Sequence, residues 1–452
     1  MAHIKITRGL DIPIKGKPKG PVQMLQKPSH LALNLDPFEG VQFKLLAKKG
    51  DAVKIGQPLV EDKNSPGRVF VSPAGGIISE IRRGLKRRLL DIVVAVEAEE
   101  SYQDFGSFNI DKASEIVNHL KAGGMFAHIR RRPFNFLANP EIPPRSIFVK
   151  AIESAPLVPP AELQVEGYEQ EFALGLKALS KITKGVVHLV HRKDSNCQAF
   201  TNAQHVQRHT AEGPHPIGNQ SVHIHQIDPI HLPDDNIWTL NAHDVVVIGY
   251  FLKEGRYLVN RIVSIGGPGI ISERTGYYKT RAGCPVSSLI SNHIEKGLIR
   301  FVSGDPLNGK KVDAEDFLRF YDYAFCAIPE NIKRKFLHFL RLGFDQFSFS
   351  KAYASGHLNN VNREYGFTTS LHGEERAFVD GSLYDKVMPL NVPSMNLVKA
   401  VMAEDYELAH ELGLLEVDEE DFALPAFVCP SKIEMTDIIR KGLKDYASQI
   451  FG

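Results

Sequence analysis

The residues best suited to binding chemistry lie in the run IRRRPFNF, from Ile129 to Phe136, where three arginines are followed at once by two phenylalanines. Guanidinium groups donate hydrogen bonds and stack on flat rings, and phenylalanine rings add an apolar wall. The run could therefore bind an anionic or quinonoid ring, or it could be a basic loop that docks on an acidic partner. The sequence leaves both interpretations open.

Histidines form a second group that could do chemistry. Nine of the 18 histidines fall between His188 and His243, and they include an HxxxH pair at His205 and His209 and an HIH run that ends at His225. A metal site would need further ligands, but the chain has no H-E-x-x-H, no carboxylate at a fixed offset and no cysteine partner. We therefore expect structural histidines, most of them hydrogen-bonded within loops.

The cysteines and glycines do not form a recognisable cofactor motif. The four cysteines lie too far apart for any C-x-x-C pair, so a zinc ribbon or a ferredoxin-type cluster is not expected, and we interpret them as reduced thiols in a cytosol. A nucleotide site needs a glycine-rich turn between a strand and a helix. The run IGGPG at Ile265 to Gly269 contains Pro268 and no helix pattern follows it, so we expect no dinucleotide binding.

The chain as a whole has 452 residues, 43% of them hydrophobic, and a net charge of +1. This length suggests about three domains. The near-zero charge gives no long-range field toward nucleic acid. The longest apolar run, from Val245 to Leu252, is far shorter than the roughly 20 residues of a spanning helix, so we expect a soluble protein that is neither exported nor inserted into a membrane.

The elements that must position these residues begin with short strands. Glycine and proline turns cut the stretch from Lys48 to Ile81 into strands typical of a small β barrel-sandwich. The stretch resembles the biotinyl/lipoyl carrier fold, in which a hairpin lysine becomes the prosthetic-group arm. Lys63 stands in that place, but Asp62, Asn64 and the turn after them break both the biotinyl and the lipoyl motif, so we expect an ordinary turn lysine.

Alternating elements follow the sandwich. A helix is predicted from Ile110 to Ala122, ending at a pair of glycines, and another from Glu169 to Leu179. Three short apolar runs, 146–149, 186–190 and 244–249, are predicted as strands of a parallel sheet. The segment from Arg256 to Ser303 again has the pattern of short strands, and Ser394 to Gly452 is predicted as amphipathic helix with acidic N-terminal and basic C-terminal ends.

Ordered motifs along the whole chain carry a more specific resemblance. They are ITRGLDIPIKG (6–16), EDKNSPG (61–67), RRPF (131–134), GPHPIG (213–218), IVSIGGP (262–268), KVMPL (386–390) and DEEDFALPAFVCPSKIE (418–434). Together they resemble the A subunit of the Na⁺-translocating NADH:quinone reductase. The resemblance implies a multidomain α/β protein, divided into a biotinyl/lipoyl-like barrel-sandwich (1–100), a Rossmann-like α/β domain (101–255), a β-grasp, SLBB-like module (256–330) and a mostly helical C-terminal domain (331–452).

The same resemblance implies a peripheral subunit on the cytoplasmic face of the bacterial inner membrane. There it would join five other subunits, some of them integral membrane proteins, in a complex that passes electrons from NADH to ubiquinone and exports Na⁺. The fold is similar to the flavin subunit of complex I, but Arg130 to Phe134 replaces that subunit's glycine-rich loop, and Cys429 alone remains where relatives hold a cluster. One thiolate cannot hold a four-iron cluster, so we expect no cofactor of its own.

For the quinone, the resemblance and the arginine–phenylalanine run together suggest a site. Arg130, Arg132 and Phe134 would supply donors and an aromatic wall, and Leu35 and Phe38 of the run LNLDPFEG would add a second wall from the sandwich. The alternative is a stand-alone carrier-like or metal-binding α/β protein with no respiratory role. Purification with or without membrane partners distinguishes the two.

Overall fold

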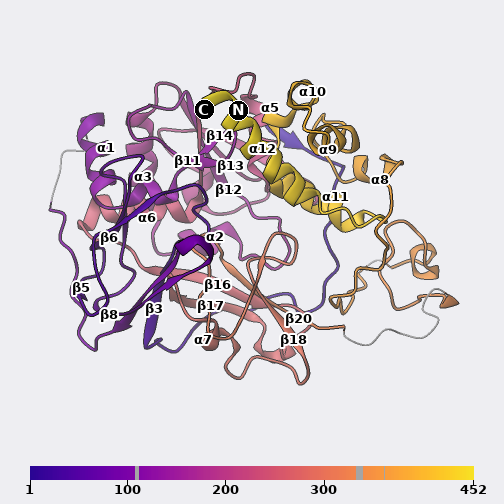
Figure 1. The fold of residues 1–452 in the computed structure, drawn as a ribbon, viewed down its shortest axis with the longest axis horizontal. Helices are drawn as coiled ribbons and strands as arrows, with labels where there is room; N and C mark the ends of the chain where they lie inside the picture. Colours follow the sequence, from indigo (N-terminus) through magenta and orange to yellow (C-terminus); the bar gives the residue numbers. More distant parts are fainter. Residues whose placement is uncertain (107–110, 332–339, 361) are drawn as a thin grey trace.

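Four β-sheets form the framework of the computed structural model in the part of the chain that it describes, residues 1–106, 111–331, 340–360 and 362–452. A mostly parallel sheet lies at the centre of the upper half in Figure 1, with the barrel-sandwich and a third β-region below it. Helices near the C-terminus, coloured orange to yellow, cover one side of the central sheet.

The N-terminal region is the predicted barrel-sandwich, built from two small antiparallel sheets. One has the strand order β3 (His30–Asn34), β9 (Leu89–Val96), β8 (Gly76–Arg83) and β5 (Ala52–Val53), and the other has β4 (Phe43–Leu45), β6 (Pro58–Asp62) and β7 (Val69–Val71). Lys63 is exposed in the turn that follows β6. Alternate residues such as Leu31 and Leu33 point inward, which gives the region its core.

The central sheet has seven strands in the described chain. Their order is β1 (His3–Lys5), β14 (Gln207–Glu212), β13 (Val186–Arg192), β12 (Ser146–Ala151), β15 (Ile237–Asn241), β10 (Arg130–Arg132) and β11 (Phe136–Leu137). The first five are parallel, whereas β10 pairs antiparallel with both β15 and β11. The arginine–phenylalanine run is therefore an antiparallel hairpin at the edge of a parallel sheet.

Helices cover both faces of this sheet. The helices of this part of the chain are α1 (Ala113–Ala122), α2 (Ala161–Val165), α3 (Glu169–Ile182), α4 (Gln198–Thr201), α5 (Gln220–Ile227) and α6 (Ala242–Glu254). Helices α3 and α6 pack closely on one face, and this close approach requires glycine at position 249. A Cβ on Gly249 would lie 1.7 Å from the carbonyl oxygen of Glu171. Helix α1 ends at Gly123 as predicted, while its predicted start at Ile110 lies outside the described residues.

The prediction of a strand from Asp244 to Gly249 was wrong, because this run forms the first half of α6. The preceding residues 237–241 form the strand instead, and Asn241 caps the helix in a capping box with Asp244. Val245, Val246 and Val247 are all buried, so this part of the helix is buried on every side. A short apolar run buried all round gives the same pattern as a buried strand.

The third β-region is the short-strand module predicted after residue 256. Its sheet has the order β19 (Lys310–Val312), β18 (Ile299–Ser303), β20 (Ala324–Pro329), β16 (Asn260–Gly266), β17 (Gly276–Arg281) and β2 (Val22–Met24), and α7 (Val286–Ile290) packs beside it. Strands β1 and β2 come from the first 24 residues, so the N-terminal segment joins the central sheet and this one before the barrel-sandwich begins.

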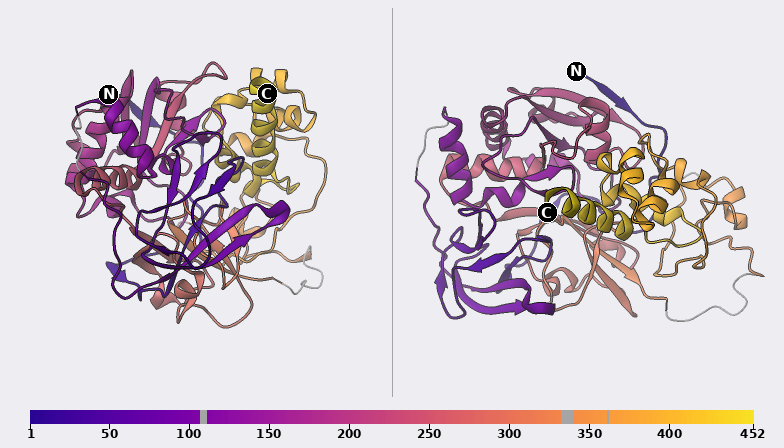
Figure 2. Two further views of the ribbon diagram at one scale, coloured as in Figure 1. Left: turned by 60° about the vertical axis from the view of Figure 1, so that its left-hand side comes forward. Right: turned by 45° about the horizontal axis from the view of Figure 1, so that its top comes forward.

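The C-terminal region carries a set of helices rather than one long amphipathic helix. They are α8 (Ser382–Asp385), α9 (Ser394–Met402), α10 (Tyr406–Glu411), α11 (Ala423–Val428) and α12 (Met435–Phe451). Figure 2 shows them beside the central sheet in both views. The predicted acidic first turn is present in α12 at Asp437, but its last turn has no basic residue, because Lys441 and Lys444 lie earlier in the helix.

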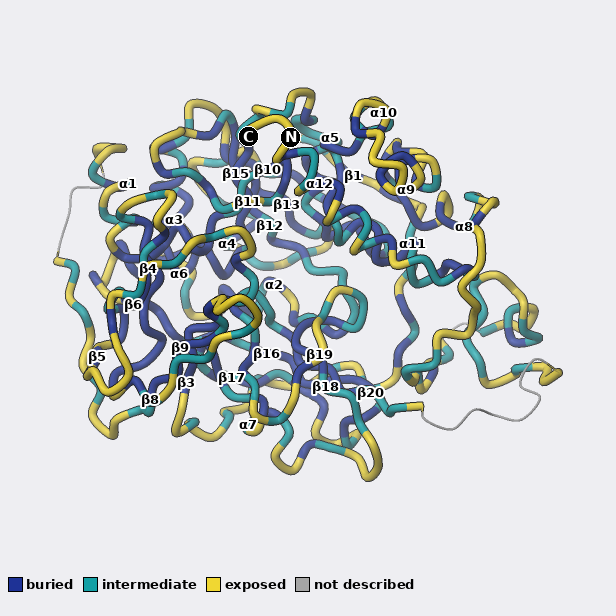
Figure 3. The backbone as a smooth tube through the Cα atoms, viewed as in Figure 1, coloured by how far each residue is buried: buried dark blue, intermediate teal, exposed yellow. Residues whose placement is uncertain are grey.

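Burial follows these layers. The strands of the central sheet are mostly buried, whereas the irregular segment after residue 340 is largely exposed (Figure 3). One core lies between the central sheet and the C-terminal helices and includes Ile4, Ile6, Ile12 and Ile14. The N-terminal segment therefore helps to hold the last helices on the sheet.

A buried ion pair between Asp62 and Arg68 closes the hairpin of β6 and β7, and Arg68 also donates a 2.8 Å hydrogen bond to the carbonyl of Ala138 in the α/β region. The variant Asp62→Ala leaves the guanidinium buried without its partner. We expect it to lower the free energy of local opening of β6 and β7, measured by native-state hydrogen exchange, by about 3 to 5 kcal/mol.

The matched control is Lys44→Met, which removes the exposed pair between Lys44 and Glu61 on the neighbouring strands. Its expected cost is below about 1 kcal/mol. Equal effects of the two variants would show that the buried pair contributes no more than a surface pair.

Candidate functional site

The hairpin of β10 and β11 is the candidate site, and the conformation of its turn determines the direction in which its side chains point. Phe134 and Asn135 occupy the turn with φ of 70° and 53°, a left-handed conformation that phenylalanine rarely adopts. Arg130 donates a 3.0 Å hydrogen bond from Nε to the side-chain oxygen of Asn135, which closes the turn across the hairpin. The arginines on β10 alternate between the two faces of the sheet.

Arg132 points into the interior and is only 2% exposed. Its guanidinium donates to Ser221 Oγ at 2.7 Å and to the carbonyl of Val417 at 2.6 Å. Asp418 Oδ2 lies 3.9 Å from the same guanidinium. Arg132 therefore connects the hairpin to α5 and to the C-terminal region, rather than opening onto solvent.

Arg130 lies beside the β-region that follows residue 256. Its guanidinium sits 4.7 Å from the ring centroid of Tyr321, a cation–π distance. The hydroxyl of Tyr321 donates a 2.6 Å hydrogen bond to the carbonyl of Ala127, and burial raises its pKa to about 12. The phenol is thus held neutral next to a permanent positive charge.

The predicted second wall lies next to Tyr321, whose ring contacts Arg130. The ring of Phe38 lies 5.5 Å from that of Tyr321 and 4.7 Å from that of Phe70. Leu35 is fully buried and Phe38 is 2% exposed, so both belong to the core between the barrel-sandwich and the next β-region. They are therefore part of the core against which Tyr321 packs, and they do not line an accessible site.

Phe134 faces the end of the last helix. It is 5% exposed and stacks on Phe136 with 5.7 Å between ring centroids. Its other neighbours are Tyr446 at 6.2 Å and Phe451, edge-on, at 5.8 Å. The structure therefore places Phe134 in an aromatic group with α12, whereas Arg132 faces α5.

Sequence reasoning missed the accessible members of this group. Arg131 lies 5.9 Å from the ring of Phe136 and 6.0 Å from that of Phe451, and its Nε has no partner in the described structure. Phe136 is 37% exposed and Phe451 is 50% exposed. The alternation of strand residues could have predicted that Arg131 points to the other face from Arg130 and Arg132. Nothing in the sequence indicates that Phe451 packs against the hairpin.

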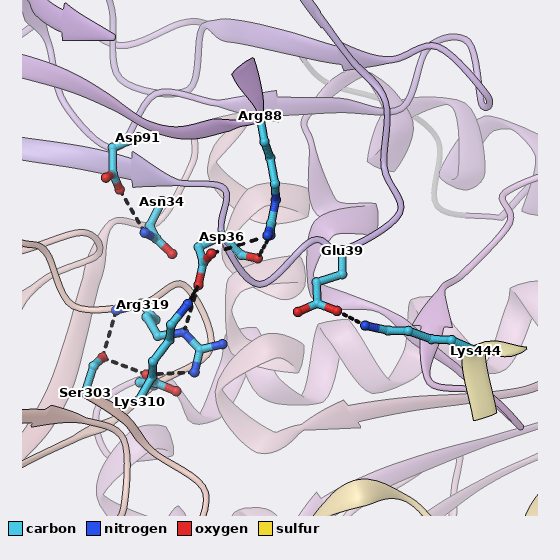
Figure 4. A network of polar contacts seen from close by, with 10 residues as sticks. Asn34, Asp36, Glu39, Arg88, Asp91, Ser303, Lys310, Arg319 and Lys444 are labelled. Carbon is cyan, nitrogen blue, oxygen red and sulfur yellow. Dashed lines mark hydrogen bonds and ion pairs between the residues drawn. The ribbon is translucent and has the colours of Figure 1, made fainter. Parts of the chain in front are cut away.

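The loop that carries Leu35 and Phe38 also connects three regions through charges (Figure 4). Asp36 accepts a 2.7 Å hydrogen bond from Lys310 and lies 3.5 Å from Arg88 and 3.8 Å from Arg319. Burial acts to raise the pKa of Asp36, but Lys310 and the two arginines hold it below its usual value.

The same loop reaches the C-terminal region. Glu39 forms an ion pair with Lys444 of α12, as Figure 4 shows. The loop is therefore a further connection to the last helix, in addition to the contacts of Phe134 with Tyr446 and Phe451.

Four of the clustered histidines have hydrogen-bond partners that fix them in the fold. His209 lies 3.0 Å from His188 across neighbouring strands, and burial lowers the pKa of His209 to about 4. His223 hydrogen-bonds to the carbonyl of Ile217, and His225 pairs with Glu416, which raises the pKa of His225. Within the described residues, no group of three or more histidine, cysteine or acidic side chains could hold a metal ion.

An acidic turn, which we define as residues Asp418–Asp421, lies between the hairpin and α11. Burial and then the charge of Asp418 raise the pKa of Glu419 to about 7, while Arg440 lies 3.5 Å away. Burial raises the pKa of Glu420 to about 8. Carboxyl groups in this range can exchange protons near neutral pH.

This shift gives the wild-type chain a pH-dependent stability. Because the pKa of Glu420 is raised in the folded state, that state holds the extra proton, so the stabilisation is present at low pH and falls as the pH rises from about 4.5 to about 8. The charges that face Glu420 are Lys150 of β12, Arg132 of β10, and Asp418 and Asp421 of its own turn.

We therefore expect the thermal midpoint of wild type to fall, relative to Glu420→Gln, across this pH window. The maximum slope for one proton is about 1.4 kcal/mol per pH unit. Parallel pH profiles of the two proteins in differential scanning calorimetry would show that Glu420 titrates at its ordinary pKa.

The site as a whole offers fixed donors and flat apolar rings. No described helix of the protein is both long and apolar enough to cross a lipid bilayer. The arrangement is suited to binding and positioning a ligand or partner, with Arg130, Arg131 and Phe136 as its accessible members.

Comparisons with known proteins agree with this architecture. Three family models match: the NqrA N-terminal barrel-sandwich hybrid domain over residues 4–97, the NqrA second alpha/beta domain over 111–257 and the NQRA C-terminal domain over 262–314. An NAD⁺-reducing nickel–iron hydrogenase chain aligns at 14% identity over 49% of this chain and 47% of its own, with a TM-score of 0.36, a likeness too low to support a conclusion.

Curated relatives match over nearly the whole length. The A subunit of the Na(+)-translocating NADH-quinone reductase from Chlamydia caviae is 36% identical and covers 99% of this chain and 97% of its own. The protein of the same name from Tolumonas auensis is 36% identical over 97% of this chain and 98% of its own. The chain therefore belongs to the NqrA family, the A subunits of the Na(+)-translocating NADH-quinone reductases.

Proposed function

We propose that the chain is a peripheral subunit of a sodium-pumping NADH:ubiquinone reductase, not catalytic alone, which docks on five other subunits at the cytoplasmic face of the membrane. The observation that supports this most strongly is the full-length match to relatives named as the A subunit of that enzyme. The complex would reduce ubiquinone with electrons from NADH and export Na⁺, while this subunit holds no tightly bound cofactor.

Purification tests this assignment. A chain tagged at an exposed position should sediment with membranes and, after detergent extraction, bring its partner subunits with it, together with NADH:quinone reductase activity. Released from the partners, it should stay in solution without detergent and should not bind protein-free liposomes, and its absorption spectrum should show no flavin. Recovery of the chain alone from the cytosolic fraction would favour a stand-alone protein.

We also propose that the hairpin shapes a quinone site. A ubiquinone head group offers two carbonyl acceptors and a flat ring, which suit a guanidinium donor beside an aromatic face. Arg131 and the exposed ring of Phe136, 5.9 Å apart, provide that pair, with Phe134 stacked behind. Arg130, which lies against Tyr321, would be a second donor beside an aromatic ring. The buried residues Arg132, Leu35 and Phe38 would support these groups from the interior, Phe38 through Tyr321.

Replacement of the ring tests the quinone site in the assembled complex. Phe136→Ala should weaken quinone or quinone-site inhibitor binding by about 1 to 3 kcal/mol, the scale of a lost aromatic contact. Phe134→Ala should do the same and also destabilise the hairpin locally by about 3 to 5 kcal/mol, because this ring is buried. Titration of inhibition against wild type measures the first effect, and hydrogen exchange measures the second.

Phe344→Ala is the control, since its ring is 49% exposed and lies in the segment after residue 340. Failure of the hairpin variants to assemble would identify the hairpin as a docking surface instead. Normal assembly with unchanged affinity in both variants would exclude these rings from the site.

A further inference from the structure

The acidic turn contacts the N-terminus of α5 through carboxylates that are almost fully buried. Asp421 is 2% exposed, and its Oδ1 accepts a 2.8 Å hydrogen bond from the side-chain amide of Asn219. Its Oδ2 accepts a second, also 2.8 Å long, from the backbone amide of Asp418. Both oxygens of a buried carboxylate are thereby satisfied, one of them by the α/β region.

A buried cation completes this contact. Arg132 spans Ser221 of α5 and the carbonyl of Val417, the residue before the turn, and it lies 3.9 Å from Asp418. Its Nε is buried and has no partner in the described structure. The guanidinium thus faces the turn with a donor still unused.

The place in the fold is one that favours oxyanions. Helix α5 follows β14 through the loop 213–219, so its N-terminus lies toward the carboxyl ends of the parallel strands. The amides of a helix N-terminus and its dipole attract negative charge, and open α/β sheets bind ligands at that edge. Lys150, next to the carboxyl end of β12, adds a second positive charge toward the turn.

We propose that the acidic turn is an internal ligand of the α/β region. Its carboxylates occupy an oxyanion site made by Asn219, Ser221 and Arg132 at the N-terminus of α5. The occupied site latches the C-terminal helices onto the central sheet and excludes free phosphate-bearing ligands from that place. The loop 213–219, which carries GPHPIG between β14 and α5, is thus used for a contact within the chain.

The test neutralises the turn in the full-length protein and offers a free anion in its place. In the double variant D418N/D421N, amide exchange of residues 417–428 and 217–224, followed by mass spectrometry, should rise about tenfold or more, the opening expected from a lost charge-assisted hydrogen bond. Millimolar inorganic pyrophosphate should then restore protection of residues 217–224, while leaving wild type unchanged.

A charge-matched control distinguishes a specific effect at the acidic turn from a general effect of charge or ionic strength. E407Q/E411Q removes the same charge from the exposed face of α10 and should show neither the rise nor the response to pyrophosphate. Adding Ser221→Ala to D418N/D421N should abolish the response. Unchanged exchange in D418N/D421N, or a rise that pyrophosphate reverses no better than an equal ionic strength of sodium chloride, would overturn the proposal.

Discussion

A buried guanidinium determines how the regions of this protein meet. Taking a charge out of water is costly unless hydrogen bonds and an opposite charge compensate for it. Ser221, the carbonyl of Val417 and Asp418 compensate the charge of Arg132 in part, and they come from α5 and the C-terminal region, so this contact fixes the hairpin relative to both. Once Arg132 is fixed, the alternation along β10 turns Arg131 to the other face, toward α12. The placement of the candidate site is thus a consequence of satisfying one interior charge.

The loop from Leu35 to Glu39 also fixes regions relative to one another, through both apolar contacts and ion pairs. Phe38 contributes apolar contacts to the core, while Asp36 and Glu39 contribute ion pairs to two different regions. Apolar burial supplies most of the free energy but no direction, whereas the ion pairs add little free energy and fix the relative positions. The hairpin therefore lies next to a loop whose position is fixed by ion pairs and whose stability comes from apolar burial.

The sequence predicted well those features that depend on neighbouring residues. The barrel-sandwich strands follow from glycine and proline turns, and α3 follows from its apolar spacing. The run 244–249 could not be assigned, because a helix buried on all sides has no polar face to reveal its period. The assignment of β1 and β2 to two different sheets depends on parallel pairings between residues that are 207 (His3 and Thr210) and 255 (Val22 and Tyr277) positions apart, for which no local signal exists.

In the candidate site, too, the sequence predicted the residue types but not the features that depend on distant parts of the chain. The residue types in the arginine–phenylalanine run indicated a binding surface, but three consecutive arginines gave no means to tell which one is buried. The fold separates them: Arg132 is an interior anchor, Arg130 is held against Tyr321, and Arg131 lies beside exposed rings. Since a ligand can only use groups that it can reach, any recognition at the hairpin must begin with Arg130, Arg131 and Phe136. The buried members would act on such a ligand indirectly, by holding those three in position.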